Sequence, residues 1–145
     1  TSSLWSEMFF TRKVRAAEIA AREAVERVIE LLDLQHHRDS MVAGLPYGVR
    51  KVVELGRALC IEPKLLLLDE PSAGLAPVIV QSIFDLVKKI RKEGYTVMIV
   101  EQNVRQVLKV VDRAYLLEAG SIRMSGTSAE LAASDTIREA YLGAI

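Results

Sequence analysis

The stretch Leu65–Pro71, LLLLDEP, decides the fold, because four leucines run directly into two adjacent carboxylates. Unbroken apolar runs of this kind are typical of strands in a parallel sheet that helices cover on both faces. We therefore expect a buried strand over Leu65–Leu68, with Asp69 and Glu70 at its carboxyl end, where α/β proteins bind their ligands. An acid pair there suits a Mg²⁺-nucleotide site, in which one carboxylate holds the metal and the other polarises a water. The alternative is a strand that ends in solvated acids and a turn at Pro71.

The composition describes an ordinary globular protein. Of the 145 residues, 50% are hydrophobic and 26% are charged, which excludes a disordered chain. The 19 basic and 19 acidic residues cancel, so no charge excess marks a nucleic-acid-binding face. The single cysteine, Cys60, excludes an internal disulfide and fits a reducing compartment. No apolar run approaches the roughly 20 residues of a membrane span, so we expect any membrane role to come through a partner.

Helices and strands alternate along the chain. Apolar residues at helical spacing predict a helix over about 13–34, and a polar connection follows with His36 and His37, which as neighbours rarely ligate one metal together. The other expected elements are a helix that ends near 60, strands over 65–68 and 96–100, helices from Pro77 to Gly94 and over 104–111, a hairpin of 114–118 with 121–125, and short helices near 128–133 and 136–142. This alternation predicts parallel pairing with right-handed crossovers.

Three motifs together resemble the ATP-binding subunit of an ABC transporter. They are LPYGVRK at Leu45–Lys51, LLLLDEPSAGLAP at Leu65–Pro77 and VEQNV at Val100–Val104. The resemblance implies an α/β fold, part of a P-loop NTPase-like ABC ATPase core with a parallel sheet, plus a helical subdomain. It divides the chain into the helical subdomain, residues 1–44, and the C-terminal half of the ATPase core, residues 45–145.

The resemblance also implies roles for individual residues. Asp69 would be a Mg²⁺ ligand through water, and Glu70 the general base for the attacking water. The place of the family's signature sequence, usually Leu-Ser-Gly-Gly-Gln, is occupied by Leu45, Pro46, Tyr47, Gly48 and Val49. In the family, backbone N–H groups at this helix N-terminus face the γ-phosphate of ATP held mainly by the opposite subunit. Here Pro46 replaces the usual serine and Tyr47 the first glycine, so a hydroxyl contact is lost.

Two further segments complete the expected nucleotide site. SAGLAP resembles the loop that crosses the seam of an ATPase dimer, which implies nucleotide-site positions for Ala73 and Gly74, although Ala76 replaces the acid expected there. Gln102 stands where the family normally carries a switch histidine after the second strand. Glutamine still donates a hydrogen bond to a phosphate oxygen, but it does not become a cation near neutral pH. The implied catalytic contact therefore loses its charge-assisted component.

The phosphate loop of the family is not found in this sequence. No Gly-x-x-x-x-Gly-Lys-Ser/Thr occurs among the eight glycines. In the family this loop lies N-terminal to the helical lobe, where this chain begins, so we expect the N-terminal phosphate-loop half of the core to be absent. The resemblance then implies an ATPase, with ATP and Mg²⁺ as cofactors, as the full-length parent. The 145 residues alone are expected to hydrolyse ATP negligibly, because positioning and electrostatics supply nearly all catalysis in phosphoryl transfer.

EPSAGLAP, VEQNV and the ending AYLGAI resemble the ATPases of branched-chain or hydrophobic amino-acid importers. This implies a cytoplasmic subunit, peripheral at the inner face of the cell membrane, that couples ATP hydrolysis to transport. Its partners would be transmembrane permease subunits and a second ATPase subunit, in a homo- or heterodimer, without nucleic acid and without direct membrane insertion. Three alternatives stay open: a nucleotide-free ABC-like interaction or dimerisation module, a soluble ABC-type ATPase acting on DNA or ribosomes, and an unrelated α/β enzyme with an Asp-Glu metal site.

Overall fold

The computed structural model describes residues 12–142, and the chain divides into two compact units, Thr1–Pro63 and Lys64–Ile145. The first eleven residues of the expected helical subdomain and the last three of the AYLGAI ending lie outside the described residues. The functional boundary expected between residues 44 and 45 stays a prediction.

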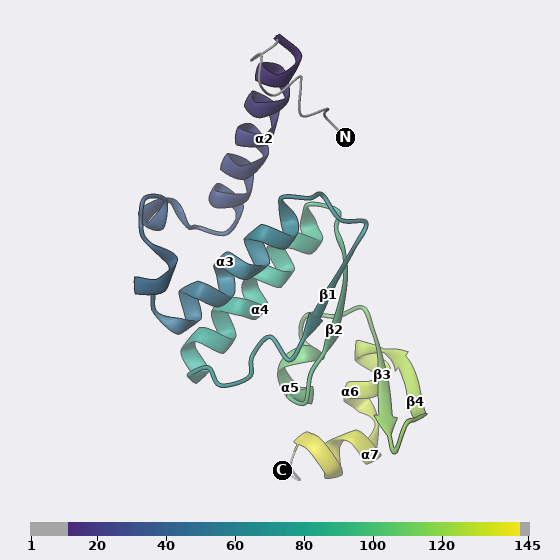
Figure 1. Ribbon diagram of the computed structural model, residues 1–145. Helices are drawn as coiled ribbons and strands as arrows, with labels where there is room; N and C mark the ends of the chain where they lie inside the picture. Colours follow the sequence, from purple (N-terminus) through teal and green to yellow (C-terminus); the bar gives the residue numbers. More distant parts are fainter. Residues whose placement is uncertain (1–11, 143–145) are drawn as a thin grey trace. The chain divides into compact units, whose positions relative to one another are not determined.

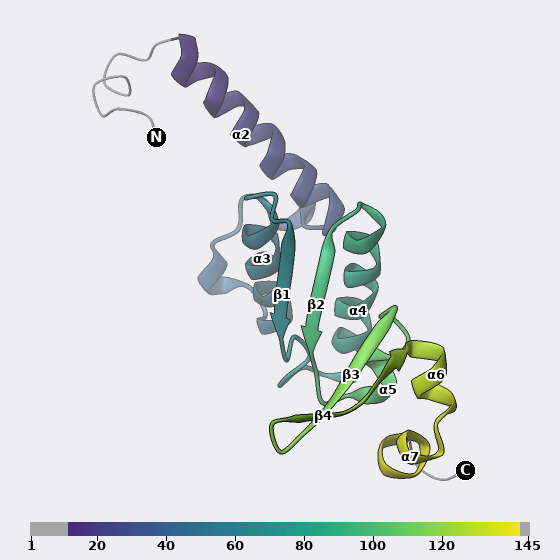
Figure 2. The ribbon, with the colours of Figure 1, turned by 90° about the vertical axis from the view of Figure 1, so that its right-hand side faces the viewer.

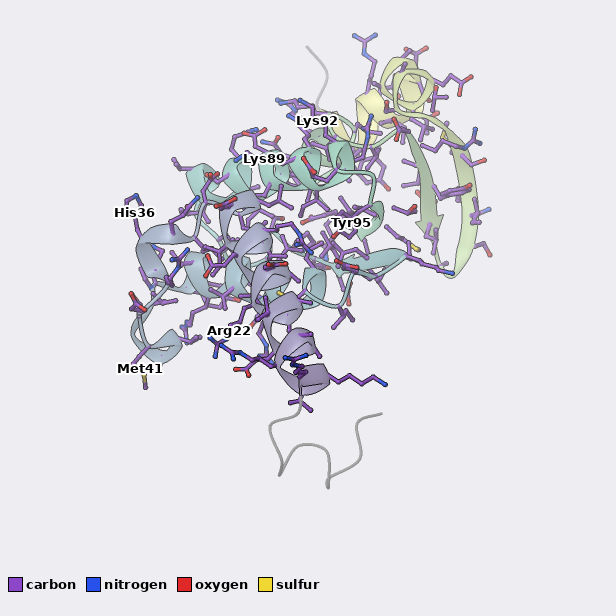
Figure 3. All side chains as sticks on the ribbon, turned by 90° about the horizontal axis from the view of Figure 1, so that it is seen from above. Arg22, His36, Met41, Lys89, Lys92 and Tyr95 are labelled. Carbon is purple, nitrogen blue, oxygen red and sulfur yellow. The ribbon has the colours of Figure 1, made fainter. Side chains whose placement is uncertain are left out.

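The described part of the first unit is helical (Figure 1). Its elements are the helix α2 (Arg12–Leu31), the 3-10 turns η1 (Gln35–His37) and η2 (Val42–Gly44), and the helix α3 (Tyr47–Leu59). Gly56 allows α3 to pack closely, because a Cβ there would lie 3.1 Å from Leu32 Cδ1 and 3.4 Å from Val28 Cγ1. His36 and Met41 point outward from the connection between the two helices (Figure 3). Across residues 12–142 no group of three or more His, Cys, Asp and Glu side chains is placed to hold a metal.

The second unit carries both pairs of strands (Figure 2). Its elements are β1 (Leu65–Asp69), α4 (Pro77–Lys92), β2 (Thr96–Val100), α5 (Val104–Val107), β3 (Arg113–Glu118), β4 (Ser121–Thr127), α6 (Ser128–Ala133), α7 (Asp135–Ile137) and the π-helical turn η3 (Arg138–Leu142). β1 pairs with β2 in parallel, and β3 pairs with β4 in antiparallel orientation. The expected parallel pairing and the expected hairpin are both confirmed.

The β1–β2 sheet is covered on one face only by the described residues. On the covered face, Ile99 packs against the core cluster of Val80, Phe84 and Val110, which joins α4 to the segment after α5. The opposite face is apolar and about half exposed: Leu65 55%, Leu67 60%, Met98 55% and Val100 46%. The expectation of a strand buried on both faces is therefore wrong for the described chain. The leucine run marks a strand with two apolar faces, but it does not say what packs on each of them.

The segment after β2 is less helical than expected. α5 ends at Val107, whereas the apolar spacing predicted a helix to about 111. The Asn103 side chain caps α5 by accepting the backbone N–H of Gln106 at 3.2 Å. Beyond α5 the chain turns, and the Arg91 guanidinium holds it to the end of α4 by donating to the Val110 carbonyl at 3.1 Å and pairing with Asp112 at 3.1 Å.

A two-residue turn connects the two strands of the hairpin, and both of its residues have a positive φ. Ala119 has φ 47° and Gly120 has φ 76°, the left-handed geometry that matches the twist of the flanking strands. After the hairpin, a capping box starts α6, because Thr127 and Glu130 satisfy each other's backbone N–H groups. None of the helices in residues 12–142 combines the length and apolar character that crossing a bilayer requires.

Candidate active site

The site is built at the carboxyl ends of β1 and β2, which lie side by side (Figure 2). The parallel register pairs Asp69 with Val100, so the residues that follow the two strands leave the sheet at the same edge. Glu70 follows β1, and Glu101 and Gln102 follow β2. Residues more than thirty positions apart in sequence, such as Glu70 and Gln102, therefore come into contact.

Glu70 begins a tight turn with an unusual backbone conformation. Its φ is 43°, in the left-handed region that non-glycine residues rarely adopt. Its N–H donates to the Val100 carbonyl at 2.8 Å, and its carbonyl accepts the N–H of Ala73 at 3.0 Å. Gly74 then continues the turn with φ 71°. This conformation costs about 1 kcal/mol at a residue with a Cβ, and such costs cluster at functional sites.

The side chains of Glu70 and Gln102 are joined directly. Gln102 Nε2 donates a hydrogen bond to Glu70 Oε1 at 2.6 Å. The Gln102 side chain is exposed, and that of Glu70 is half-buried. The two residues to which the resemblance gives catalytic roles are thus brought together, with the amide bonded to one oxygen of the carboxylate.

Glu101 makes contacts that the sequence reasoning missed. Its Oε1 accepts the backbone N–H of Ser72 at 2.9 Å, and its Oε2 accepts the N–H of Asn103 at 3.3 Å. The carboxylate therefore ties the turn after β1 to the segment after β2. The only signal in the sequence was an acid at the end of the second strand.

The carboxylates of Asp69 and Glu70 suit Mg²⁺, which takes few protein ligands, better than a metal whose ligands all come from the protein. Register and strand alternation place Asp69 at the tip of the exposed sheet face, next to Glu70 in the chain. Mg²⁺ is usually bound by one or two carboxylates, with water and substrate phosphates completing its shell. Among residues 12–142 no third His, Cys, Asp or Glu is grouped with this pair to hold a metal, so the pair fits a magnesium ion that arrives with a nucleotide.

The signature segment belongs to the first unit. Leu45 is buried, and Pro46 precedes α3 with φ −54° and ψ 149° and without a side-chain cap for the helix. Tyr47 is 48% exposed, and the Arg50 guanidinium and the Lys51 ammonium each lie 5.7 Å from the centre of its ring. The half-buried Gly48 and Val49 lie in the first turn of α3, where backbone N–H groups lack partners within the helix.

Comparison with known proteins fits these motifs. The sequence profile of the ABC transporter family matches residues 2–73, which include the signature segment and the Asp69-Glu70 pair. The high-affinity branched-chain amino acid transport ATP-binding protein BraG of Pseudomonas aeruginosa is 48% identical over 120 residues. The chain belongs to the ABC transporter family of ATP-binding proteins. The resemblance that the motifs indicated is confirmed.

A further relative in this ABC family belongs to a different transport system. The lipopolysaccharide export system ATP-binding protein LptB of Escherichia coli K12 is 37% identical over 129 residues. These matches cover 82% of this chain and 52% of BraG, and 87% of this chain and 54% of LptB. The chain thus spans about half the length of the curated relatives it matches.

Solved structures agree on the fold. The structure of cbiO1 from Clostridium perfringens, part of the ABC transporter complex cbiONQ, matches with a TM-score of 0.77 at 31% identity, over 84% of this chain and 49% of that one. The ADP conformation of the ATP-binding cassette MJ1267 matches with a TM-score of 0.73 at 28% identity, over 99% of this chain and 57% of that one. The expected α/β ABC ATPase core with a parallel sheet is confirmed.

Proposed function

We propose that the complete protein carrying this sequence binds and hydrolyses ATP and thereby drives an ABC transporter. The contact between Glu70 and Gln102 at the tips of two parallel strands carries this proposal, because it joins two expected catalytic groups beside Asp69. Membership of the ABC transporter family also supports it.

Each residue has a distinct part in the proposed reaction. Asp69 would hold Mg²⁺, which neutralises charge on the phosphates when bound. Glu70 would accept a proton from the attacking water through its second carboxylate oxygen, since Gln102 already occupies the first. Gln102 would orient that carboxylate through this hydrogen bond, and its second amide N–H would donate to a phosphate oxygen.

Other residues would contribute from a second ATPase subunit. The first N–H groups of α3, at Tyr47, Gly48 and Val49, lack a side-chain cap and form a helix N-terminus of the kind that binds anions. The signature Leu45–Val49 would therefore face ATP held by the partner subunit, with Ala73 and Gly74 lining the seam. The role of each of these residues is an inference from the family motif.

The transported solute is proposed to be a branched-chain or other hydrophobic amino acid. The support is the 48% identity to BraG, against 37% to LptB. Permease subunits would then hold the protein at the cytoplasmic face of the membrane. Membrane vesicles with the complete transporter should accumulate labelled leucine, isoleucine or valine when ATP is supplied, and ATP-driven lipopolysaccharide movement without uptake would reassign the solute.

Mg²⁺-dependent ATP turnover by the complete protein tests the activity itself. We expect hydrolysis that EDTA abolishes and that Asp69→Asn lowers strongly. The 145-residue segment alone should show negligible turnover, as it contains no phosphate loop. Turnover by the purified segment that Glu70→Gln abolishes would overturn that expectation.

A second candidate is a nucleotide-free interaction or dimerisation module. The exposed apolar face of Leu65, Leu67, Met98 and Val100 favours it, because such surfaces mark association sites. A complete protein that binds no ATP but forms a stable complex through this face would support the module over the ATPase.

A further inference from the structure

Glu101 is the carboxylate at the site to which neither the motif comparison nor the proposed chemistry assigns a task. It follows β2 directly and is half-buried. Both of its oxygens accept backbone N–H groups: Ser72 at 2.9 Å and Asn103 at 3.3 Å. A carboxylate whose two oxygens both accept backbone N–H groups stabilises the surrounding backbone rather than binding a ligand.

The contact with Ser72 joins two segments that are 29 residues apart. Ser72 lies two residues after Glu70, within the turn closed by the Ala73-to-Glu70 hydrogen bond. Glu101 lies directly before Gln102, whose amide reaches back to Glu70. Two hydrogen bonds therefore connect the segments that follow β1 and β2. In one, Gln102 after β2 donates to Glu70 after β1; in the other, Ser72 after β1 donates to Glu101 after β2.

We propose that Glu101 is a positioning residue, which holds the Glu70 turn and Gln102 in register for the reaction. The inference rests on the proposed ATPase function. Glu70 needs such support, because its left-handed φ of 43° is a conformation that the local chain does not favour. Hydrogen bonds from backbone N–H groups to a carboxylate are about twice as strong as those between neutral groups. These two hydrogen bonds of the Glu101 carboxylate, here called the Glu101 clamp, thus offset the cost of the left-handed backbone at Glu70 and keep the Glu70 carboxylate in place.

Three variants of the complete protein separate positioning from general stability. Glu101→Ala removes both acceptors, whereas Glu101→Gln keeps one carbonyl oxygen that can still accept from Ser72. Glu130→Gln is the matched control, since Glu130 also accepts a backbone N–H, that of Thr127 at 2.7 Å, but in the capping box of α6. For each variant we would measure kcat, the nucleotide dissociation constant, and amide hydrogen exchange at Ser72 by NMR.

We expect Glu101→Ala to lower kcat by about tenfold or more while the nucleotide dissociation constant stays within about twofold, as loss of a charged hydrogen bond at a positioning residue predicts. Glu101→Gln should recover part of the loss, and Glu130→Gln should change neither constant. Exchange at Ser72 should accelerate by about tenfold in Glu101→Ala.

Each contrary result overturns the inference in an identifiable way. Unchanged exchange at Ser72 would show that the clamp does not form. Faster exchange with an unchanged kcat would show that the clamp forms but positions nothing for the reaction. Equal losses of kcat in Glu101→Ala and Glu130→Gln would show that the lower kcat comes from a general loss of stability and not from lost positioning. A wild-type protein without ATP turnover would refute the proposed function, while the exchange measurement would still decide whether the clamp exists.

Discussion

Glu70→Gln is the substitution that most cleanly separates the chemistry of the site from its structure. The amide has nearly the shape of the carboxylate and keeps a carbonyl oxygen where Gln102 Nε2 now donates at 2.6 Å. The backbone hydrogen bonds of the turn, to the Val100 carbonyl and from the Ala73 N–H, do not involve the side chain and remain. The variant therefore loses the proton acceptor and little else.

The expected effects differ in size by enough to decide the question. Replacing a charge-assisted hydrogen bond with a neutral one at a half-buried side chain costs about 1 kcal/mol of folding free energy or less. Losing a general base costs about 10²–10⁴-fold in rate. At 1.36 kcal/mol per tenfold, that is about 3–5 kcal/mol of activation free energy. Hydrolysis should collapse while the fold and nucleotide binding persist.

Single-turnover hydrolysis of ATP by the complete protein, together with nucleotide binding and urea unfolding, would measure all three quantities. Glu93→Gln is the matched control, because Glu93 is an exposed glutamate at the end of α4, on a different part of the unit. A Glu70→Gln rate within about tenfold of wild type would refute the general-base role. Loss of nucleotide binding would instead show that Glu70 holds the metal.

Three further predictions concern stability. Phe84→Ala should destabilise the protein by about 3–5 kcal/mol in urea unfolding, because Phe84 is fully buried, while Val78→Ala on the exposed side of α4 should cost little; equal effects would refute the assigned core. Hydrogen bonds from the backbone and hydroxyl of Thr127 lower the pKa of Glu130 below its usual 4.5, so its stabilisation is present above that pH and is lost as the pH falls through the lowered pKa. Unfolding midpoints of wild type and Glu130→Gln should therefore converge in acid, and a constant gap would count against the capping box. Ala119→Asn should raise stability by up to about 1 kcal/mol, since asparagine tolerates the positive φ better, and a lower melting temperature would contradict that turn geometry.

Much of the fold was predictable because its signals are local. The apolar run Leu65–Leu68 predicted β1 to within one residue, and Pro77 and Gly94 bracket α4 and its cap as proline and glycine usually do. The hairpin followed from two alternating segments around Ala119-Gly120.

The parts that were not predictable depend on contacts between distant residues. The helical spacing of apolar residues continues to residue 111, but α5 ends at Val107. The Val110 carbonyl, beyond the helix, accepts a hydrogen bond from Arg91 instead. The half-exposed Leu65 and Leu67 show that apolar composition does not identify a covering partner. The Glu101 contact with Ser72 spans 29 residues and joins a carboxylate to a backbone N–H, which no residue pattern encodes.

The central claim is that Asp69 holds the metal of a Mg²⁺-nucleotide while Glu70 accepts a proton from the attacking water. Mn²⁺ binding tests this claim most directly. Electron paramagnetic resonance would follow Mn²⁺ on the complete protein in the presence of a non-hydrolysable ATP analogue. We expect Asp69→Asn to weaken Mn²⁺ binding by about tenfold or more and Glu70→Gln to leave it unchanged. The opposite pattern, with binding lost in Glu70→Gln and kept in Asp69→Asn, would contradict the assignment of the two carboxylates.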